Sequence, residues 1–471
     1  MRVSDMTSNS HFVGQDTRTE SGVIVRNGTT VGDAIRAIES SKVQTAFVVD
    51  SDHVLLGIVT NGDVRRFLID GGNIESAVEP ALNRNFKAVR VDAPREESLK
   101  LFDMGYTVVP RLDHQGRLVD LLTPDHHHGD FEIAGRTIVR ARAPARISFA
   151  GGGTDLTYFF SRYDGLVLNA AISRYAMTTL IPRETFEIDI YSHDLGTHQH
   201  FVSSRAMIEA SGHNLLSTTA SLIKPDFGFE MHVSAEFPIG SGLGGSSAVV
   251  TSILTAFNEL RADRWSLYEV AELAFQAERL CFKVPGGWQD QYVACFGGFN
   301  LIQFTPTGNS VNPLRIPDDV ICELEESLIL FDTGLEHDSG DLHTTQKKEM
   351  SNLEGDEKLS RLTQFCQEMN RALARQDLRR FGEGLHQAWL LKKQTSSRVS
   401  SEKIDQIYDT ALSAGALGGK LLGAGGGGYI LFFVPPDVHS AVVAALRPFD
   451  CKPSRVRFDI KGARSWRTRI P

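Results

Sequence analysis

The chain has 471 residues, of which 41% are hydrophobic and 23% charged, as is ordinary for a soluble globular protein of two to four domains. Its net charge of −9 disfavours a nucleic-acid binder, because contacts with a phosphate backbone need a basic face. The five cysteines are scattered without a paired spacing, which favours the reduced thiols of a cytoplasm. The sequence contains no run of about 18 apolar residues, so no membrane span is predicted.

A weak internal repeat occupies residues 20–128. The pattern is a helix–strand–strand–helix unit that occurs twice. The predicted elements are a helix from Thr30, strands over 45–50 and 55–60, a helix from Asp63, a helix over 98–102, and strands over 106–110 and 116–123.

This unit resembles a tandem pair of CBS domains. In that family a Thr-x-x-Asp after the second strand binds the ribose of an adenine nucleotide, and Thr60 and Asp63 match it. The second copy has His126 where the acid would stand. The resemblance therefore implies one adenine-nucleotide site, with a packing or regulatory module that binds no ligand as the alternative. The histidine-containing stretch 126–130 is predicted to be a solvated linker, with the domain boundary within 128–136.

Residues 137–156 predict a strand, a glycine-rich turn and then an acid. The segment contains Arg146 near the end of the strand and Asp155 after three glycines and a threonine. Read without other context, Asp155 is typical of an aspartate that caps a turn through its own side chain.

A second glycine-rich loop joins a strand to a helix. Apolar residues alternate over 227–237, which predicts a half-buried strand, and helical spacing begins at Val249. Between them lies the sequence Pro238-Ile-Gly-Ser-Gly-Leu-Gly-Gly-Ser-Ser-Ala248. Glycines let the backbone turn its N–H groups onto a ligand, and a helix N-terminus favours negative charge, so the loop is a candidate phosphate site.

Two familiar nucleotide motifs do not fit this loop. No Gly-Lys-Ser/Thr follows it, as a Walker loop requires, and no second strand ends in an acid about 20 residues further on, as a dinucleotide fold requires. Ser246 and Ser247 at the helix start could instead ligate the magnesium of a nucleotide. A glycine-rich turn with a serine helix cap is the alternative.

Two acids and a glycine run follow. Helical spacing predicts a helix over Leu267–Leu280 that Glu278 ends, and the segment 285–292 carries Asp290. Carboxylates near phosphates hold magnesium or receive a hydroxyl proton, whereas the alternative is a surface glutamate and a turn aspartate. A predicted helix ends in Lys392 and Lys393, whose positive charges would complement the dipole at the helix C-terminus. For Lys393, contact with a sugar phosphate is an equally open alternative.

The last motif, over 415–434, places a dense glycine run before an apolar strand. Linkers mix glycine with serine and lack a flanking apolar strand, so this run is not typical of a linker. Its Lys420 is a candidate ligand for a sugar or a phosphate.

Together the three glycine-rich motifs resemble, in the same order, those of the GHMP kinases, and most of all those of D-glycero-α-D-manno-heptose 7-phosphate kinases. The Gly-Gly-Gly-Thr-Asp of the first motif differs from the Gly-Glu-His that precedes Thr-Asp in galactokinases. The resemblance covers about 137–470. It implies an α+β fold with a ribosomal-S5-like N-terminal lobe over 137–310 and a ferredoxin-like C-terminal lobe over 311–471, preceded by the α/β CBS pair.

The resemblance also implies roles for individual residues. Asp290 would act on the sugar hydroxyl, Arg146 would lie beside the transferred phosphoryl group, and Ser247 and Glu278 would share Mg²⁺. ATP would lie across Pro238, Gly240, Ser241, Gly242, Leu243, Gly244, Gly245, Ser246 and Ser247. The sugar would contact Gly152, Gly153, Thr154, Asp155, Lys420, Gly425 and Gly426.

The activity that the resemblance implies is ATP-dependent phosphorylation of the anomeric hydroxyl of D-glycero-D-manno-heptose 7-phosphate to the 1,7-bisphosphate. An anomeric kinase of another sugar, such as fucose, and a nucleotide-sensing regulatory protein are the alternatives. The expected partners are the sugar phosphate, ATP, an adenine nucleotide at the CBS pair and a second copy of the chain in a homodimer, without nucleic acid or membrane.

Overall fold

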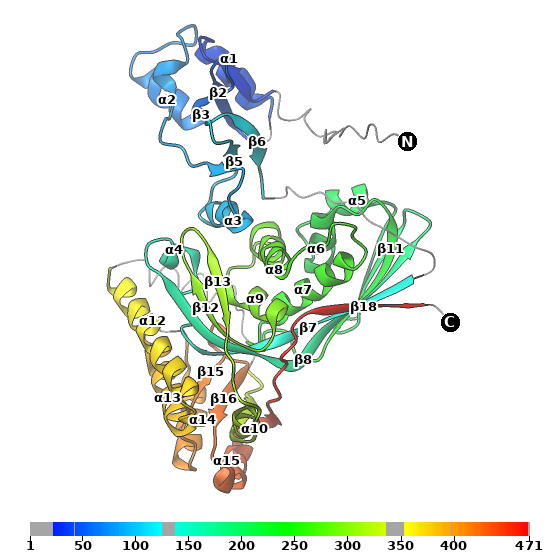
Figure 1. The fold of residues 1–471 in the computed structure, drawn as a ribbon, viewed down its shortest axis with the longest axis vertical. Helices are drawn as coiled ribbons and strands as arrows, with labels where there is room; N and C mark the ends of the chain where they lie inside the picture. The colour runs from blue at the N-terminus through cyan, green and yellow to red at the C-terminus, as the bar shows by residue number, and fades with distance from the viewer. Residues whose placement is uncertain (1–21, 42, 125–136, 336–352, 397, 470–471) are drawn as a thin grey trace, which may run out of the picture. The chain divides into compact units, whose positions relative to one another are not determined.

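The computed structural model describes most of the chain, and it divides into two compact units. One unit comprises residues 1–94 and 105–123, and the other comprises 95–104 and 124–471 (Figure 1). The predicted linker at 126–130 and the second-copy residue His126 lie outside the described residues. The described residues are 22–41, 43–124, 137–335, 353–396 and 398–469.

The first unit holds two small sheets with the same strand arrangement. In each, the first two strands pair in parallel and the last two pair antiparallel. The two helices of the first copy start alike, because Thr30 with Asp33 and Thr60 with Asp63 each form a reciprocal capping box. The elements are β1(Ile24–Arg26), α1(Val31–Glu39), β2(Thr45–Val49), β3(Leu55–Thr60), α2(Asn61–Ile69), η1(Glu79–Ala81), β4(Val89–Arg90), β5(Val109–Leu112) and β6(Leu118–Leu122).

The helix α3(Arg95–Asp103) takes the place in the second copy that α1 takes in the first. It nevertheless belongs to the second unit, although the chain on both sides of it belongs to the first. The predicted helix over 98–102 is therefore present, but it packs with α8 and η2 of the second unit.

The second unit is built on a mixed sheet whose described part has eight strands. The path runs β10-β9-β11-β8-β12-β13, β7 pairs with β8, and the C-terminal β18 pairs with β7. The β9–β11 pair is parallel, whereas the other pairs are antiparallel. The strands are β7(Thr137–Ala150), β8(Gly165–Arg183), β9(Ile188–Ser192), β10(Thr197–Phe201), β11(Gly228–Ala235), β12(Phe299–Phe304), β13(Asn309–Pro313) and β18(Arg464–Arg469).

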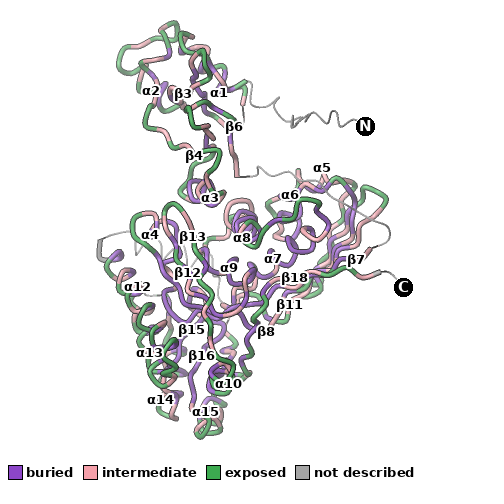
Figure 2. Tube along the Cα trace, in the orientation of Figure 1, coloured by how far each residue is buried: buried purple, intermediate pink, exposed green. Residues whose placement is uncertain are grey.

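Helices cover one face of this sheet (Figure 1). The central one is α7, which contacts both β7 and β8 and buries residues all round, as Val250, Ile253 and Phe257 illustrate. Buried residues dominate α7 and α9 in Figure 2. The elements on this side are α4(Thr157–Phe160), α5(Ser204–Glu209), α6(Leu215–Ile223), α7(Gly245–Asn258), α8(Leu267–Phe275), the π-helical turn η2(Gln276–Cys281) and α9(Gln289–Phe296).

The C-terminal lobe is an antiparallel sheet in the order β15-β16-β14-β17, packed with helices. One hydrophobic core joins it to the first sheet, since Phe149 of β7 packs edge-on against Phe381 at 5.2 Å and clusters with Leu431. Its elements are α10(Asp318–Ser327), β14(Leu328–Asp332), α12(Leu353–Ala374), α13(Leu378–Lys393), α14(Glu402–Ser413), β15(Gly418–Leu421), β16(Tyr429–Phe433), η3(Pro436–Val438), α15(His439–Leu446), η4(Arg447–Phe449) and β17(Lys452–Arg455).

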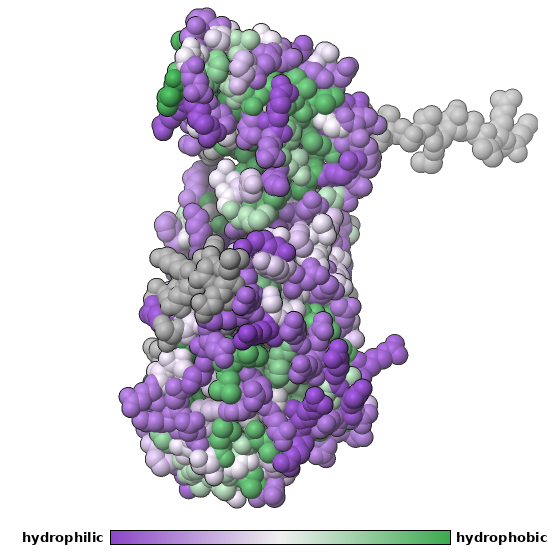
Figure 3. Space-filling model, turned by 90° about the vertical axis from the view of Figure 1, so that its left-hand side faces the viewer, coloured by the Kyte–Doolittle hydropathy of each residue, from purple (hydrophilic) through white to green (hydrophobic). Residues whose placement is uncertain are grey.

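The predicted lobe boundary after residue 310 falls inside β13, which is still part of the first sheet. The chain also returns to that sheet at its C-terminal end through β18. Among the described residues, no helix is both long and apolar enough to cross a membrane, and the face drawn in Figure 3 is largely hydrophilic.

Candidate active site

The loop before α7 has the backbone of an anion site. Gly242 and Gly244 have φ of +76° and +71°, a left-handed conformation that favours glycine. A Cβ at Gly242 would come within 2.8 Å of the carbonyl oxygen of Leu422, so the loop lies against the C-terminal glycine run. No side chain caps the first turn of α7, which leaves the N-terminal amides of that helix for a ligand.

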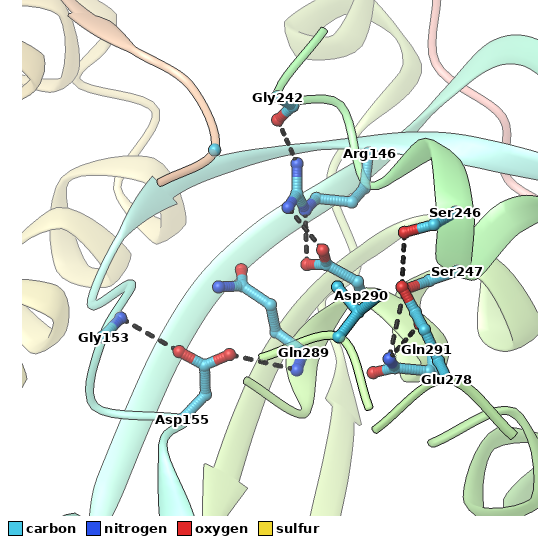
Figure 4. Close-up of polar contacts among 12 residues, drawn as sticks. Arg146, Gly153, Asp155, Gly242, Ser246, Ser247, Glu278, Gln289, Asp290 and Gln291 are labelled. Carbon is cyan, nitrogen blue, oxygen red and sulfur yellow. Dashed lines mark hydrogen bonds and ion pairs between the residues drawn. The ribbon is translucent and has the colours of Figure 1, made fainter. Parts of the chain in front are cut away.

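Glu278 lies beside this turn and is completely buried. Ser246 donates to its Oε1, and Ser247 donates to its Oε2 at 2.6 Å (Figure 4). Gln291 also donates to Oε2, at 2.8 Å. The predicted helical segment over Leu267–Leu280 is present, but Glu278 does not end it, because α8 gives way after Phe275 to the π-helical turn η2 and Glu278 lies within that turn. Turns of this kind are frequent at functional sites.

The side chains of Glu278, Ser246 and Ser247 fit Mg²⁺ by their chemistry. They are a carboxylate and two hydroxyls, which are the hard oxygen ligands that magnesium prefers. Magnesium is usually held by one or two carboxylates together with substrate phosphates, and the loop amides that would hold such phosphates lie one residue away, at Gly245.

Asp290, at the start of α9, forms a bidentate ion pair with Arg146 of β7. The Nε–Oδ1 and Nη2–Oδ2 distances are both 2.6 Å, and the two side chains are 7% and 14% exposed. Nη1 of Arg146 donates to the carbonyl of Gly242 at 2.5 Å, so the guanidinium also fastens the glycine-rich loop (Figure 4). Glu278, through Ser246 and Ser247, and Asp290, through Arg146, are therefore both connected to this loop.

Asp155 is buried beneath the first glycine-rich turn. Its Oδ1 accepts from the Gly153 amide at 2.9 Å, and its Oδ2 accepts from the Gln289 amide at 3.2 Å. Burial, and then the nearby Asp290, raises the pKa of this carboxyl. A capping aspartate accepts from the amide two residues further along the chain, whereas Asp155 accepts from Gly153, two residues before it, and from the remote Gln289. Asp155 therefore joins the glycine-rich turn to the segment that carries Asp290.

A cavity opens between these groups and the C-terminal glycine run. Four cations line it together with Asp155 and Asp290: Arg146, Arg279, Lys392 and Lys420. The ammonium of Lys420 donates to the Phe149 carbonyl at 3.2 Å, and burial followed by the charge of Arg146 lowers its pKa to about 7. Burial, followed by the positive charge of Lys420, lowers the pKa of Lys392 well below its usual range.

Lys392 was missed as a site residue. The interpretation that it complements the end of its own helix is wrong, because its ammonium donates to the carbonyls of Leu421 at 2.9 Å and Gly423 at 2.6 Å. Lys393 lies apart and pairs with Asp405 at 2.7 Å. Adjacent residues on a helix point about 100° apart, and the sequence holds no signal for which lysine faces the cavity.

Three other lining residues were also missed, namely Ser148, Gln289 and Arg279. The Oγ of Ser148 and the Oε1 of Gln289 are buried without a hydrogen-bond partner among the described residues. Buried polar atoms are usually satisfied, so both are candidates to meet a ligand. Ser148 stands between Arg146 and the glycines in the first motif, and that position is the only hint the sequence offers.

Not every predicted sugar contact reaches the cavity. Gly152, Gly153, Asp155 and Lys420 line it. The hydroxyl of Thr154 is instead used to bond the carbonyls of Gly151 and Leu166, at 2.8 and 3.1 Å. Gly425 and Gly426 face Val399, and Gly423 and Ala424 line the cavity in their place.

Comparisons with known proteins agree with this geometry. The family description "GHMP kinases N terminal domain" matches residues 213–298, "GHMP kinases C terminal" matches 369–450, and "CBS domain" matches 4–70. Over 335 residues, 70% of this chain and 99% of the relative, the sequence is 35% identical to D-glycero-alpha-D-manno-heptose 7-phosphate kinase of Campylobacter jejuni. The chain belongs to the GHMP kinase family.

Two further relatives of this GHMP kinase are sugar kinases by name. The chain is 29% identical over 339 residues to L-fucokinase/L-fucose-1-P guanylyltransferase of Bacteroides fragilis. The aligned residues cover 65% of this chain and 35% of that protein. The crystal structure of a D-glycero-D-manno-heptose 1-phosphate kinase from Bacteroides thetaiotaomicron superposes with a TM-score of 0.59 at 30% identity, covering 70% of this chain and 98% of that one. The chain is thus a sugar kinase with GHMP N- and C-terminal domains and a CBS domain at its N-terminal end.

Proposed function

We propose that this kinase transfers the γ-phosphoryl group of ATP to the anomeric hydroxyl of D-glycero-D-manno-heptose 7-phosphate, giving the 1,7-bisphosphate and ADP. The observation that carries the proposal is a buried cavity in which four cations face two carboxylates beside a glycine-rich anion loop. A sugar that already bears a phosphate needs such cations in addition to those that serve ATP. The names of the relatives support a phosphorylated heptose, although they place its phosphate at different positions.

The residues divide the chemistry between them. The anomeric oxygen attacks the γ-phosphorus, its proton passes to a carboxylate oxygen of Asp290, and the bond from γ-phosphorus to the bridging oxygen of ADP breaks. Arg146 stays beside the reacting group and offsets the negative charge that develops on the phosphoryl oxygens. Ser247 and Glu278 would hold Mg²⁺, which neutralises phosphate charge when bound.

The sugar would lie between the first and third glycine-rich motifs. Asp155, Ser148 and Gln289 face the cavity with polar oxygens, and hydroxyl groups of a sugar would satisfy them. Lys392 and Lys420, on the other wall, would hold the distal phosphate.

A kinase of another sugar at its anomeric hydroxyl is the second candidate, favoured by the 29% identity to the fucokinase protein. A screen of hexoses, heptoses and their phosphates with ATP and Mg²⁺ separates the two. The proposal expects turnover of heptose 7-phosphate and a kcat/KM for free heptose that is lower by about tenfold to a hundredfold, since the loss of a charged contact costs about 1.5–3 kcal/mol. Equal values for the two would contradict the requirement for the phosphate.

The N-terminal unit is proposed to bind an adenine nucleotide at Thr60 and Asp63. In the structure both side chains are engaged in the capping box of α2, with Thr60 Oγ1 donating to Asp63 Oδ2 at 2.6 Å, so a ribose would compete with a local contact. AMP titrated by calorimetry should bind the wild type and not Asp63→Ala, with Asp33→Ala, the same capping change in α1, as the matched control. Sedimentation of the wild type tests the expected homodimer.

A further inference from the structure

Helix α3 buries charges that a surface helix would expose. Its sequence, Arg95-Glu-Glu-Ser-Leu-Lys-Leu-Phe-Asp103, is rich in ionisable residues, yet Glu96 and Lys100 are only 5% and 3% exposed. Burying a charge is costly unless the charge is paired and hydrogen-bonded. The partners of these two residues therefore show what the helix does.

Glu96 is held by two donors within the second unit. Its Oε1 accepts from the Asn309 amide at 2.6 Å, and its Oε2 accepts from the Tyr292 hydroxyl at 3.0 Å. The side-chain amide of Asn309 also donates to that hydroxyl at 3.0 Å, so the three groups form a closed network. Tyr292 is completely buried on α9, two residues after Asp290.

Lys100 follows Glu96 on the same face of α3. Its ammonium donates to the carbonyl of Thr305 at 2.7 Å and lies 5.4 Å from the ring of Phe160 and 5.9 Å from that of Trp288. Trp288 is the N-cap of α9 and directly precedes the Gln289 and Asp290 pair.

The two ends of α3 reach two further parts of the site. Asp103 accepts a hydrogen bond from the Thr157 hydroxyl, which in turn accepts from the Trp288 indole at 2.9 Å. Arg95 donates to the side-chain oxygen of Gln276, in the turn η2.

These contacts share one spacing. Each site acid has a residue two positions away that α3 holds: Thr157 after Asp155, Gln276 before Glu278, and Trp288 and Tyr292 on the two sides of Asp290. Residues two apart on a helix point about 200° apart, so α3 grips the face of α9 opposite to the one that carries Asp290.

We propose that α3, a helix inserted from the N-terminal repeat region, positions the catalytic segment of the kinase, with Glu96 as the positioning residue. The network around Tyr292 fixes the rotation of the short helix α9, and that rotation aims the Asp290 carboxylate at Arg146 and at the sugar hydroxyl. Misplacement of a catalytic group by about 1 Å can cost on the order of a hundredfold in rate, so a modest rotation is enough to matter.

The test compares Glu96→Gln with Glu97→Gln, the same change at the next residue of α3, which is less buried. Because the proposal rests on the proposed kinase activity, kcat and KM are measured with ATP and the best sugar phosphate, at a temperature where thermal unfolding shows both variants folded. Glu96→Gln should lower kcat by about tenfold or more and leave the KM for ATP within about twofold. Glu97→Gln should match the wild type.

Tyr292→Phe provides a milder second variant, since it removes only the hydroxyl that donates a hydrogen bond to Glu96. It should also lower kcat, and the double variant should lose no more than Glu96→Gln alone, because both changes break one network. A kcat for Glu96→Gln equal to that of the wild type would overturn the proposal, as would losses that simply add.

Hydrogen exchange separates this proposal from the assigned activity. Amides of 289–296 should exchange faster in Glu96→Gln than in the wild type, while those of β16 should not change. If the wild type transfers no phosphoryl group to any sugar phosphate, the proposed function is wrong, and the exchange result alone then decides the role of α3. Unchanged exchange over 289–296 would overturn that role.

Discussion

Replacing Asp290 by Asn tests the central ion pair of the site. The change leaves the Arg146 guanidinium, which is 7% exposed, without its bidentate anion, although its bond to the Gly242 carbonyl remains. Removing one partner of a buried pair costs about 3–5 kcal/mol, and an asparagine that still accepts one hydrogen bond places the loss near the lower limit. The same change removes the proton acceptor, so kcat should fall by about a thousandfold, equivalent to about 4 kcal/mol.

A second variant separates the two effects. In Arg146→Met/Asp290→Asn both charges are gone, so the free energy of unfolding should recover to within about 1–2 kcal/mol of the wild type, while kcat stays as low as in Asp290→Asn. Urea unfolding and steady-state kinetics measure the two quantities on the same preparations. A fall in kcat below about tenfold, or 1.4 kcal/mol, in Asp290→Asn would refute the assigned role, as would recovery of activity in the double variant.

Three further changes probe other parts of the site. Lys392→Met should raise the KM for the sugar phosphate by about tenfold or more and leave the KM for ATP unchanged, whereas Lys393→Met should alter neither KM. If the two variants changed the KM for the sugar phosphate equally, the phosphate would lie elsewhere. Glu278→Gln should raise the Mg²⁺ concentration for half-maximal activity by about tenfold, and an unchanged magnesium titration would exclude it as a ligand. Burial, and then Glu96, raises the pKa of Glu272 to about 8, so the folded state holds a proton that the unfolded state lacks between about pH 4.5 and 8. That contribution to stability is complete at low pH and is lost as pH rises through 8. This group alone should lower the free energy of unfolding by on the order of 4 kcal/mol between pH 5 and 8, so the fall should be smaller in Glu272→Gln. A pH profile of the variant that runs parallel to that of the wild type would contradict the assignment.

The site motifs were predictable because each is local in sequence. The strand before the loop, the glycine run and the helix after it appear as β11, the turn at Gly242 and Gly244, and α7, since period-2 alternation and helical spacing are both strong over these residues. The acids at 278 and 290 were singled out by the resemblance of their spacing and setting to the pair of the GHMP kinases. Their distances to Ser247 and Arg146 come from packing of remote segments, which no local pattern encodes.

Three features lay outside what the pattern can show. The π-helical turn at Glu278 depends on how α8 packs, because its sequence reads as an uninterrupted helix. Lys392 and Lys393 differ only in the direction that tertiary packing gives them. Helix α3 follows the repeat pattern of the N-terminal region, and its burial and tertiary contacts, such as those of Glu96, show that it belongs with the kinase.

The cations of the cavity are stabilised in two different ways, and this difference bears on how anions bind. Arg146 pairs with Asp290, whereas Lys420 donates to the carbonyl of Phe149 and Lys392 donates to those of Leu421 and Gly423. Burial lowers the pKa of Lys420 to about 7 and lowers that of Lys392 as well. Near pH 8 Lys420 is therefore largely neutral without an anion, and the pKa of Lys392 is displaced in the same direction by burial and by Lys420. A phosphate beside them would favour the ammonium form, so binding of the sugar phosphate should take up protons above pH 7 and weaken as pH rises further. The lowered pKa values thus reduce the repulsion between the lysines and Arg146 until a substrate phosphate adds negative charge to that supplied by Asp155 and Asp290.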